Sequence, residues 1–161
     1  MKYFAAIAAA IAILALAAGC GGGGGSSSSS GASDSANATS TAGDGASAAA
    51  NEACAAANQK IAALPTPDNE QAVVEYLEQT EEAVEQLQVE VAGADGSSGI
   101  TEYSKALASS VSVLNEMTNA ARSGNPDGVR ELSKELEKLH LGKVAEAAGL
   151  QTCSEAPRAE S

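Results

Sequence analysis

The feature that most constrains this chain is a thirty-residue run, residues 21–50, that contains almost nothing a protein can bury. Of these residues, 25 are Gly, Ser or Ala, and the other five are Asp, Asn or Thr. Such a segment has too little apolar surface to offset the entropy lost on ordering, so it behaves as a flexible coil spanning roughly 30 Å. We therefore expect residues 20–50 to form a disordered tether and any folded core to follow it.

Residues 51–153 show the spacing of apolar side chains that is typical of packed α-helices. Apolar positions recur at steps of three and four in four stretches, which Pro, Gly and short polar segments separate. The stretches contain Cys54, Ala57, Ile61 and Leu64; Val73, Leu77, Thr80, Val84, Leu87 and Val91; Ile100, Tyr103, Leu107, Val111, Leu114, Met117 and Ala121; and Val129, Leu132, Leu136 and Leu139. Short connections favour antiparallel neighbours. The predicted fold class is all-α, an up-down-up-down antiparallel four-helix bundle.

Pro and Gly indicate where the predicted helices begin and end. Thr66-Pro67-Asp68 is expected to cap the second helix, and Asn125-Pro126 the fourth, because a capping side chain followed by Pro is typical of helix starts. Gly142 is expected to break or bend the fourth helix. Residues 154–161 are expected to be a disordered tail.

The first nineteen residues have the layout of a signal peptide. Met1 and Lys2 form a short positive region, and the next sixteen residues carry no charge. This apolar run is short for a spanning helix, which needs about 20 residues, and it suits a cleaved signal sequence. An uncleaved membrane anchor is the alternative interpretation.

The end of this segment resembles the lipobox of bacterial lipoproteins. Leu16-Ala17-Ala18-Gly19-Cys20 places small residues before a cysteine, with Ala17 where a larger aliphatic residue is commoner. The resemblance implies cleavage before Cys20 and transfer of a diacylglycerol to its thiol. Two or three acyl chains, palmitate among them, would anchor the protein stably, whereas a single chain binds membranes only marginally.

Two cysteines remain once Cys20 is assigned to the lipid. In an antiparallel four-helix bundle the start of the first helix and the end of the fourth lie at the same end, which would bring Cys54 and Cys153 together. Disulfides persist in oxidising compartments outside the cytoplasm. The sequence therefore predicts a Cys54–Cys153 disulfide. A free or metal-binding pair is the alternative, although two thiols with no nearby His cannot complete a tetrahedral zinc site.

The end of the predicted domain carries a second resemblance. Ala148-Gly149-Leu150-Gln151-Thr152-Cys153 is similar to the ending of many small helical lipoproteins of actinobacterial type, which also combine a Gly/Ser tether with an early partner cysteine. This resemblance implies a fold and a location, but no activity.

The charge of the chain is strongly acidic and unevenly distributed. Nine Lys and Arg face 21 Asp and Glu, a net charge of −12, which argues against nucleic acid or an anionic membrane surface as an electrostatic partner. No basic residue lies between Lys60 and Lys105. On the second predicted helix, a candidate acidic interaction face consists of Glu75, Glu78, Glu82 and Glu85. Either bases of the fourth predicted helix offset these acids within the bundle, or the acids meet cations or a basic partner.

Residues for catalysis or metal binding are sparse. His140 is the only histidine, and the single Glu137-Lys138-Leu139-His140 step falls short of the two such motifs that di-iron bundles need. The sequence contains no Gly-x-Ser-x-Gly elbow and no phosphate-binding loop. We therefore expect no enzyme activity, no metal and no cofactor.

Together these features predict a lipoprotein held at the extracytoplasmic face of the cell membrane through Cys20. Its helical domain is expected to act as a structural or protein-interaction module of the cell envelope, with an envelope protein as partner and no nucleic acid. The alternative is a small-molecule or metal-binding domain that serves an envelope transporter or sensor.

Overall fold

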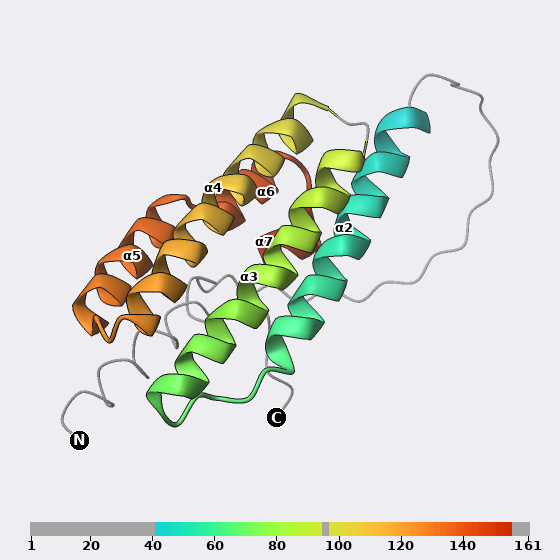
Figure 1. Cartoon of the computed structure of the whole chain (residues 1–161). Coiled ribbons are helices and arrows are strands. Elements are labelled where there is room, and N and C mark those ends of the chain that lie inside the picture. The colour runs from blue at the N-terminus through green and yellow to red at the C-terminus, as the bar shows by residue number, and fades with distance from the viewer. Residues whose placement is uncertain (1–40, 95–96, 156–161) are drawn as a thin grey trace, which may run out of the picture.

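The structure, a computed structural model, describes residues 41–94 and 97–155, and this part of the chain is all-helical (Figure 1). No residue in these ranges forms a strand. The helices are α2 (Thr41–Ala62), α3 (Glu70–Gly93), α4 (Ser98–Arg122), α5 (Pro126–Lys138), α6 (Leu141–Ala147) and α7 (Gln151–Ser154). The all-α prediction is confirmed for the described residues.

Helix α2 begins ten residues before the expected boundary between tether and domain. It starts at Thr41, whereas the sequence predicts a tether that reaches residue 50. Ala has the highest helix propensity, and the Ala-rich stretch 46–50 leads directly into the apolar stripe. Ala50 is completely buried in the core. Helix propensity and core packing together therefore extend the helix into the segment that composition assigns to the tether.

The start of α3 also differs from the predicted one. Thr66 is not the cap; the N-cap is Asn69, whose side-chain oxygen accepts a hydrogen bond from the backbone N–H of Ala72 at 2.9 Å. Asn is a stronger cap than Thr, and Glu70 in the first turn suits the positive end of the helix dipole. Residues 65–68 consequently belong to the irregular connection between α2 and α3.

The connection between α4 and α5 is as predicted. Helix α4 ends at Arg122, and Gly124 has a φ of 68°, a conformation that favours glycine. The Asn125 side chain accepts a hydrogen bond from the Gly128 N–H at 3.0 Å, and Pro126 occupies the first turn of α5. A cap followed by Pro is therefore a reliable local signal at this position.

The predicted break at Gly142 is wrong by two residues. Helix α5 ends at Lys138, and the chain turns at His140, which has a φ of 48° and precedes α6. His tolerates the left-handed conformation better than most residues. Gly142 lies inside α6, where an added Cβ would come within 3.3 Å of the Ser154 carbonyl oxygen. This glycine lets α6 and α7 approach closely and does not end a helix.

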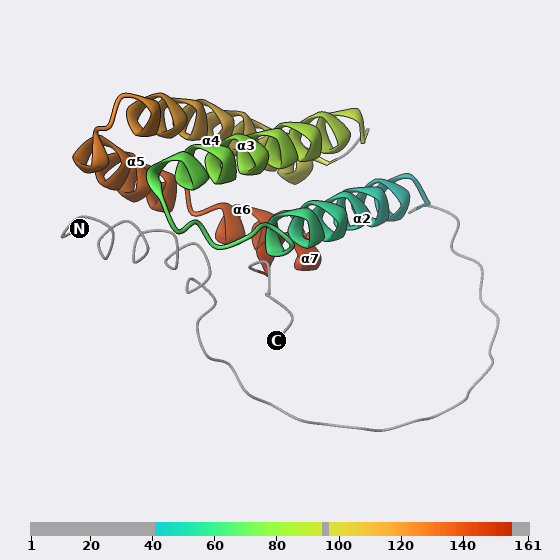
Figure 2. The same cartoon turned by 60° about the horizontal axis from the view of Figure 1, so that its bottom comes forward.

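The helices pack mainly as sequence neighbours, and the last two short helices return the chain to the first (Figures 1 and 2). Helix α3 packs against α2 and α4, and α4 also packs against α5 and α6. Helix α7 packs against both α6 and α2. The element that reaches α2 from the C-terminal half is therefore α7, because the turn at His140 redirects the chain after α5.

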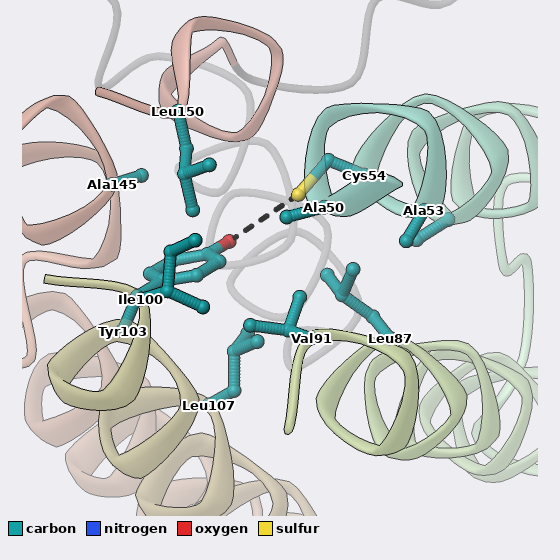
Figure 3. Packing of buried hydrophobic residues seen from close by; sticks show 11 residues of the cluster. Ala50, Ala53, Cys54, Leu87, Val91, Ile100, Tyr103, Leu107, Ala145 and Leu150 are labelled. Carbon is teal, nitrogen blue, oxygen red and sulfur yellow. Dashed lines mark hydrogen bonds between the residues drawn. The ribbon is translucent and has the colours of Figure 1, made fainter. Parts of the chain in front are cut away.

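Buried side chains form two clusters along α3 and α4. One joins α3, α4 and α5 and includes Leu77, Leu114 and Val129. The other joins α2, α3, α4, α6 and the residue that precedes α7, and Figure 3 shows it. Its buried members are Ala50, Ala53, Cys54, Ala57, Leu87, Val91, Ile100, Tyr103, Leu107, Ala145 and Leu150. Most positions of the predicted apolar stripes are buried. In α3 the prediction included Val84, which is half-buried, and omitted its neighbour Ala83, which is buried.

Candidate functional site

The predicted pairing of Cys54 with Cys153 is confirmed. Their Sγ atoms are joined in a disulfide, and their Cα atoms lie 5.1 Å apart, within the range usual for disulfides. The topological reason for the pairing differs from the expected one. Cys54 lies within α2 and Cys153 within α7, so α6 and α7, and not the end of the fourth helix, bring the second cysteine to the first.

Polar contacts around the disulfide fasten α7 to α2. The Asn51 side chain accepts a hydrogen bond from the Thr152 N–H at 2.9 Å, and the Asn58 amide donates to the carbonyl oxygens of Thr152 and Glu155 at 3.3 Å each. A helix as short as α7 cannot satisfy all the N–H and C=O groups at its ends with hydrogen bonds of its own. The two Asn side chains of α2 supply some of the missing partners. The covalent link therefore lies within a wider non-covalent attachment.

The inner side of the disulfide faces a buried tyrosine. The Tyr103 hydroxyl lies 3.8 Å from Cys54 Sγ, as Figure 3 shows. Tyr103 is 3 % exposed, and burial raises its pKa to about 12. Cys54 is itself 1 % exposed. This environment is apolar and packed, so the pair has the character of a structural crosslink.

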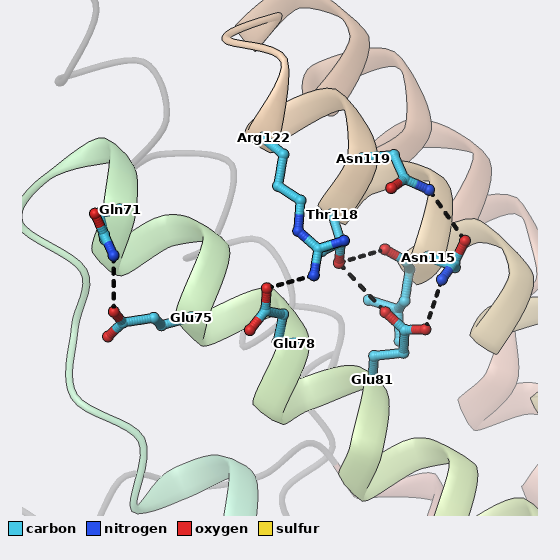
Figure 4. A network of polar contacts seen from close by, with 9 residues as sticks. Gln71, Glu75, Glu78, Glu81, Asn115, Thr118, Asn119 and Arg122 are labelled. Carbon is cyan, nitrogen blue, oxygen red and sulfur yellow. Dashed lines mark hydrogen bonds and ion pairs between the residues drawn. The ribbon is translucent and has the colours of Figure 1, made fainter.

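The four glutamates of the candidate acidic face do not share one environment. Glu78 forms an ion pair of 2.6 Å with Arg122 at the end of α4, whereas Glu75 lies away from Arg122 (Figure 4). Glu82 and Glu85 are exposed. The expected offset by bases of the fourth predicted helix is wrong for Glu78, because its neighbour is α4. In α5, Arg130 pairs instead with Asp127 of the same helix at 2.7 Å.

A polar network between α3 and α4 was not anticipated from the sequence. Glu81 accepts hydrogen bonds from Asn115 at 2.9 Å and from the Thr118 hydroxyl at 3.3 Å, and Asn119 donates to Asn115 at 3.1 Å (Figure 4). The sequence of α4 does contain an indication of this network, because four polar residues recur at the spacing of one helix face: Asn115, Thr118, Asn119 and Arg122. This network fixes the position of α3 along α4. Because Glu81 is engaged in it, fewer acidic side chains of α3 are free to bind a partner.

A groove lies where the α2–α3 connection meets the first turns of α3. It has a volume of about 220 Å³, and its lining includes Pro65, Pro67, Asp68, Glu75 and Tyr76. We refer to it as the α2–α3 groove. Tyr76 is half-buried, and burial raises its pKa above the usual 10.0. The sequence stripe omits Tyr76, because this residue lies beside the apolar stripe of α3.

Other predicted features are either exposed or outside the described residues. His140 and Glu137 are both exposed at the end of α5. Within residues 41–94 and 97–155, no group of three or more His, Cys, Asp or Glu side chains could hold a metal ion. The described helices also lack the combination of length and apolar character that crossing a membrane requires. The expected tail, residues 154–161, begins too early, because Ser154 ends α7. The predicted signal peptide, Cys20, the tether residues up to 40 and residues 156–161 lie outside the described part of the chain.

No protein-family profile, no curated protein and no solved structure matches this chain.

Proposed function

We propose that this protein is a lipid-anchored extracytoplasmic lipoprotein whose helical domain acts as a structural or protein-interaction module of the cell envelope. The observation that carries the proposal is the placement of Cys54 and Cys153 at disulfide distance. The chain has three cysteines, so this pairing leaves Cys20 as the one outside the domain. A disulfide is typical of oxidising compartments, which agrees with export by the segment that precedes Cys20.

The proposed mature chain begins at Cys20 after removal of residues 1–19. Its domain is an antiparallel four-helix bundle formed by α2 to α5, an arrangement supported by the packing of each helix against the next. Residues 21–40 precede α2 and consist largely of Gly, Ser and Ala. As a flexible tether they would span roughly 25 Å between the lipid and the domain.

An interaction role is favoured over a catalytic one by the kind of surface the domain offers. The chain is strongly acidic, and the α2–α3 groove is a small surface feature of about 220 Å³. Such a surface suits weak, electrostatically guided contacts with basic partners. We assign no catalytic residue, metal or cofactor to it.

Metabolic labelling with an alkyne-tagged fatty acid tests the anchor. Wild-type protein is expected to carry the label and to fractionate with membranes, whereas the Cys20→Ala variant is expected to lose both properties because no other thiol is available for acylation. A Ser26→Ala variant, altered in the same tether, is the matched control and should label normally. Labelling of Cys20→Ala at the wild-type level would refute the anchor.

Crosslinking in intact cells tests the interaction role. We expect one envelope protein to be recovered reproducibly with the anchored wild-type protein, and recovery to fall when Cys20→Ala removes the protein from the membrane. Recovery of no protein above the level seen with an unrelated lipoprotein would contradict the role.

A further inference from the structure

The α2–α3 groove is lined by two prolines and a tyrosine. Pro65 and Pro67 belong to the connection between α2 and α3, where their rings restrict the backbone. Tyr76 projects from the second turn of α3 and is half-buried beside them. A groove built from prolines and a half-buried tyrosine keeps its shape in the absence of a ligand, and this lowers the entropic cost of binding.

The size of the α2–α3 groove restricts what it can hold. Its volume of about 220 Å³ lies below the roughly 300–1,000 Å³ typical of pockets for drug-sized molecules. A cavity of this size accommodates one long side chain. The groove is therefore matched to a single residue that projects from a partner and not to an enclosed small molecule.

The negative charge of the groove indicates that the side chain it would bind is positively charged. Asp68 and Glu75 both line it, and within the described residues the ion pairs are Glu78–Arg122 and Asp127–Arg130. The contacts of the two groove carboxylates are neutral: Asp68 accepts from the Asn69 amide at 2.7 Å, and Glu75 from the Gln71 amide at 3.5 Å. No base among the described residues pairs with either carboxylate, and both line the groove together with Tyr76, whose ring can attract a cation.

We propose that the α2–α3 groove binds a Lys or Arg side chain presented by a protein partner, with Asp68 and Glu75 pairing with its charge and Tyr76 contacting its stem. This inference rests on the proposed role as an interaction module. The groove follows the C-terminal end of α2, a helix of 22 residues and hence about 33 Å long, and the proposed tether joins the opposite end. The groove therefore lies at the end of α2 that the proposed tether does not join.

Binding of a defined peptide tests the proposal. Full-length protein in a non-ionic detergent is titrated into a fluorescent, end-capped peptide that contains two Arg residues, and into the same peptide with citrulline, which keeps the shape of Arg without its charge. We expect fluorescence anisotropy to report binding of the Arg peptide and at least fivefold weaker binding of the citrulline peptide. Raising the salt concentration should weaken Arg-peptide binding because exposed charges are screened.

Variants locate the binding site. Asp68→Asn combined with Glu75→Gln should weaken binding of the Arg peptide about fivefold, equivalent to about 1 kcal/mol. The matched control, Glu82→Gln combined with Glu85→Gln, removes the same charge from α3 outside the groove and should weaken binding less than twofold. A Tyr76→Leu variant, which keeps an apolar side chain, should also weaken binding. Circular dichroism verifies that each variant is folded.

Two results would overturn the proposal. Equal losses in the groove pair and the control pair would mean that the peptide responds only to net charge, and equal binding of the Arg and citrulline peptides would mean that no cation is recognised. Cys20 labelling and membrane fractionation are independent of both results. Failure of peptide binding with intact labelling would therefore reject the groove and leave the anchor unaffected.

Discussion

Replacing Cys153 with Ala tests how the domain is held together. The disulfide closes a loop with a sequence separation of 99 residues. Restricting an unfolded chain of that length removes conformational entropy worth about 4.7 kcal/mol at 25 °C. The hydrogen bonds of Asn51 and Asn58 to α7 remain possible in the variant, so the loss should come mainly from the greater entropy of its unfolded state.

The expected loss is large relative to the total stability of a domain. Typical unfolding free energies are about 5–15 kcal/mol, so a loss of about 4.7 kcal/mol is at least about 30 % of the total. With an unfolding entropy of about 2.1 cal/mol/K per residue over roughly 110 residues, the melting temperature should fall by about 20 °C. The variant should still fold at low temperature, because both core clusters keep nearly all their apolar side chains.

Urea unfolding of the full chain in non-ionic detergent, followed by circular dichroism, measures this loss. The wild type is examined with and without a thiol reductant, and reduction under unfolding conditions should reproduce the effect of Cys153→Ala. The variant itself should not respond to the reductant, which provides the control. A loss below about 1 kcal/mol would refute the reasoning, because it would mean that the crosslink does not restrict the unfolded chain as its loop length requires.

Two further predictions concern the core. Burial raises the pKa of Tyr103 from the usual 10.0 to about 12, so the unfolded chain loses this proton at a lower pH than the folded one, and stability should fall by about 2 kcal/mol between pH 10 and pH 12. Urea unfolding across this range should show the fall, and Tyr103→Phe should reduce it, whereas an unchanged pH profile in the variant would contradict the assignment. Gly99→Ala should destabilise the domain by about 1–3 kcal/mol, because the added Cβ would lie 2.9 Å from the Ala148 Cα. In the control, Gly93→Ala, the added Cβ meets no atom within 4 Å, so the melting temperature should not fall. Equal melting temperatures for the two variants would contradict the close approach of α4 to the end of α6.

Local signals in the sequence predicted the helices well. The stripes of α3 and α4 and the Asn125-Pro126 cap depend on residues three or four positions apart, which lie on the same helix face whatever the rest of the chain does. Even so, the starts of α2 and α3 were misplaced. Asn69 is a stronger cap than Thr66, so local chemistry alone favours the observed start of α3. The start of α2 depends in addition on the burial of Ala50, which only the tertiary structure provides.

The candidate site was less predictable than the helices. The pairing of Cys54 with Cys153 followed from the number of cysteines, but the route by α6 and α7 did not, because it depends on the left-handed turn at His140. The α2–α3 groove was missed for a related reason. Its walls come from an irregular connection, and its shape depends on where α3 begins.

The sequence alone therefore determined the all-α class, the faces that the main helices bury and the identity of the paired cysteines, since these depend on spacing along the chain and on composition. Only the tertiary structure decided that α7 packs against α2, that Glu78 pairs with Arg122 while Glu75 does not, and that Gly99 and Gly142 permit close helix approach. These outcomes depend on which surfaces meet across long sequence separations. Many packings of the same helices share the same local pattern, and the fit of side chains between helices selects one of them.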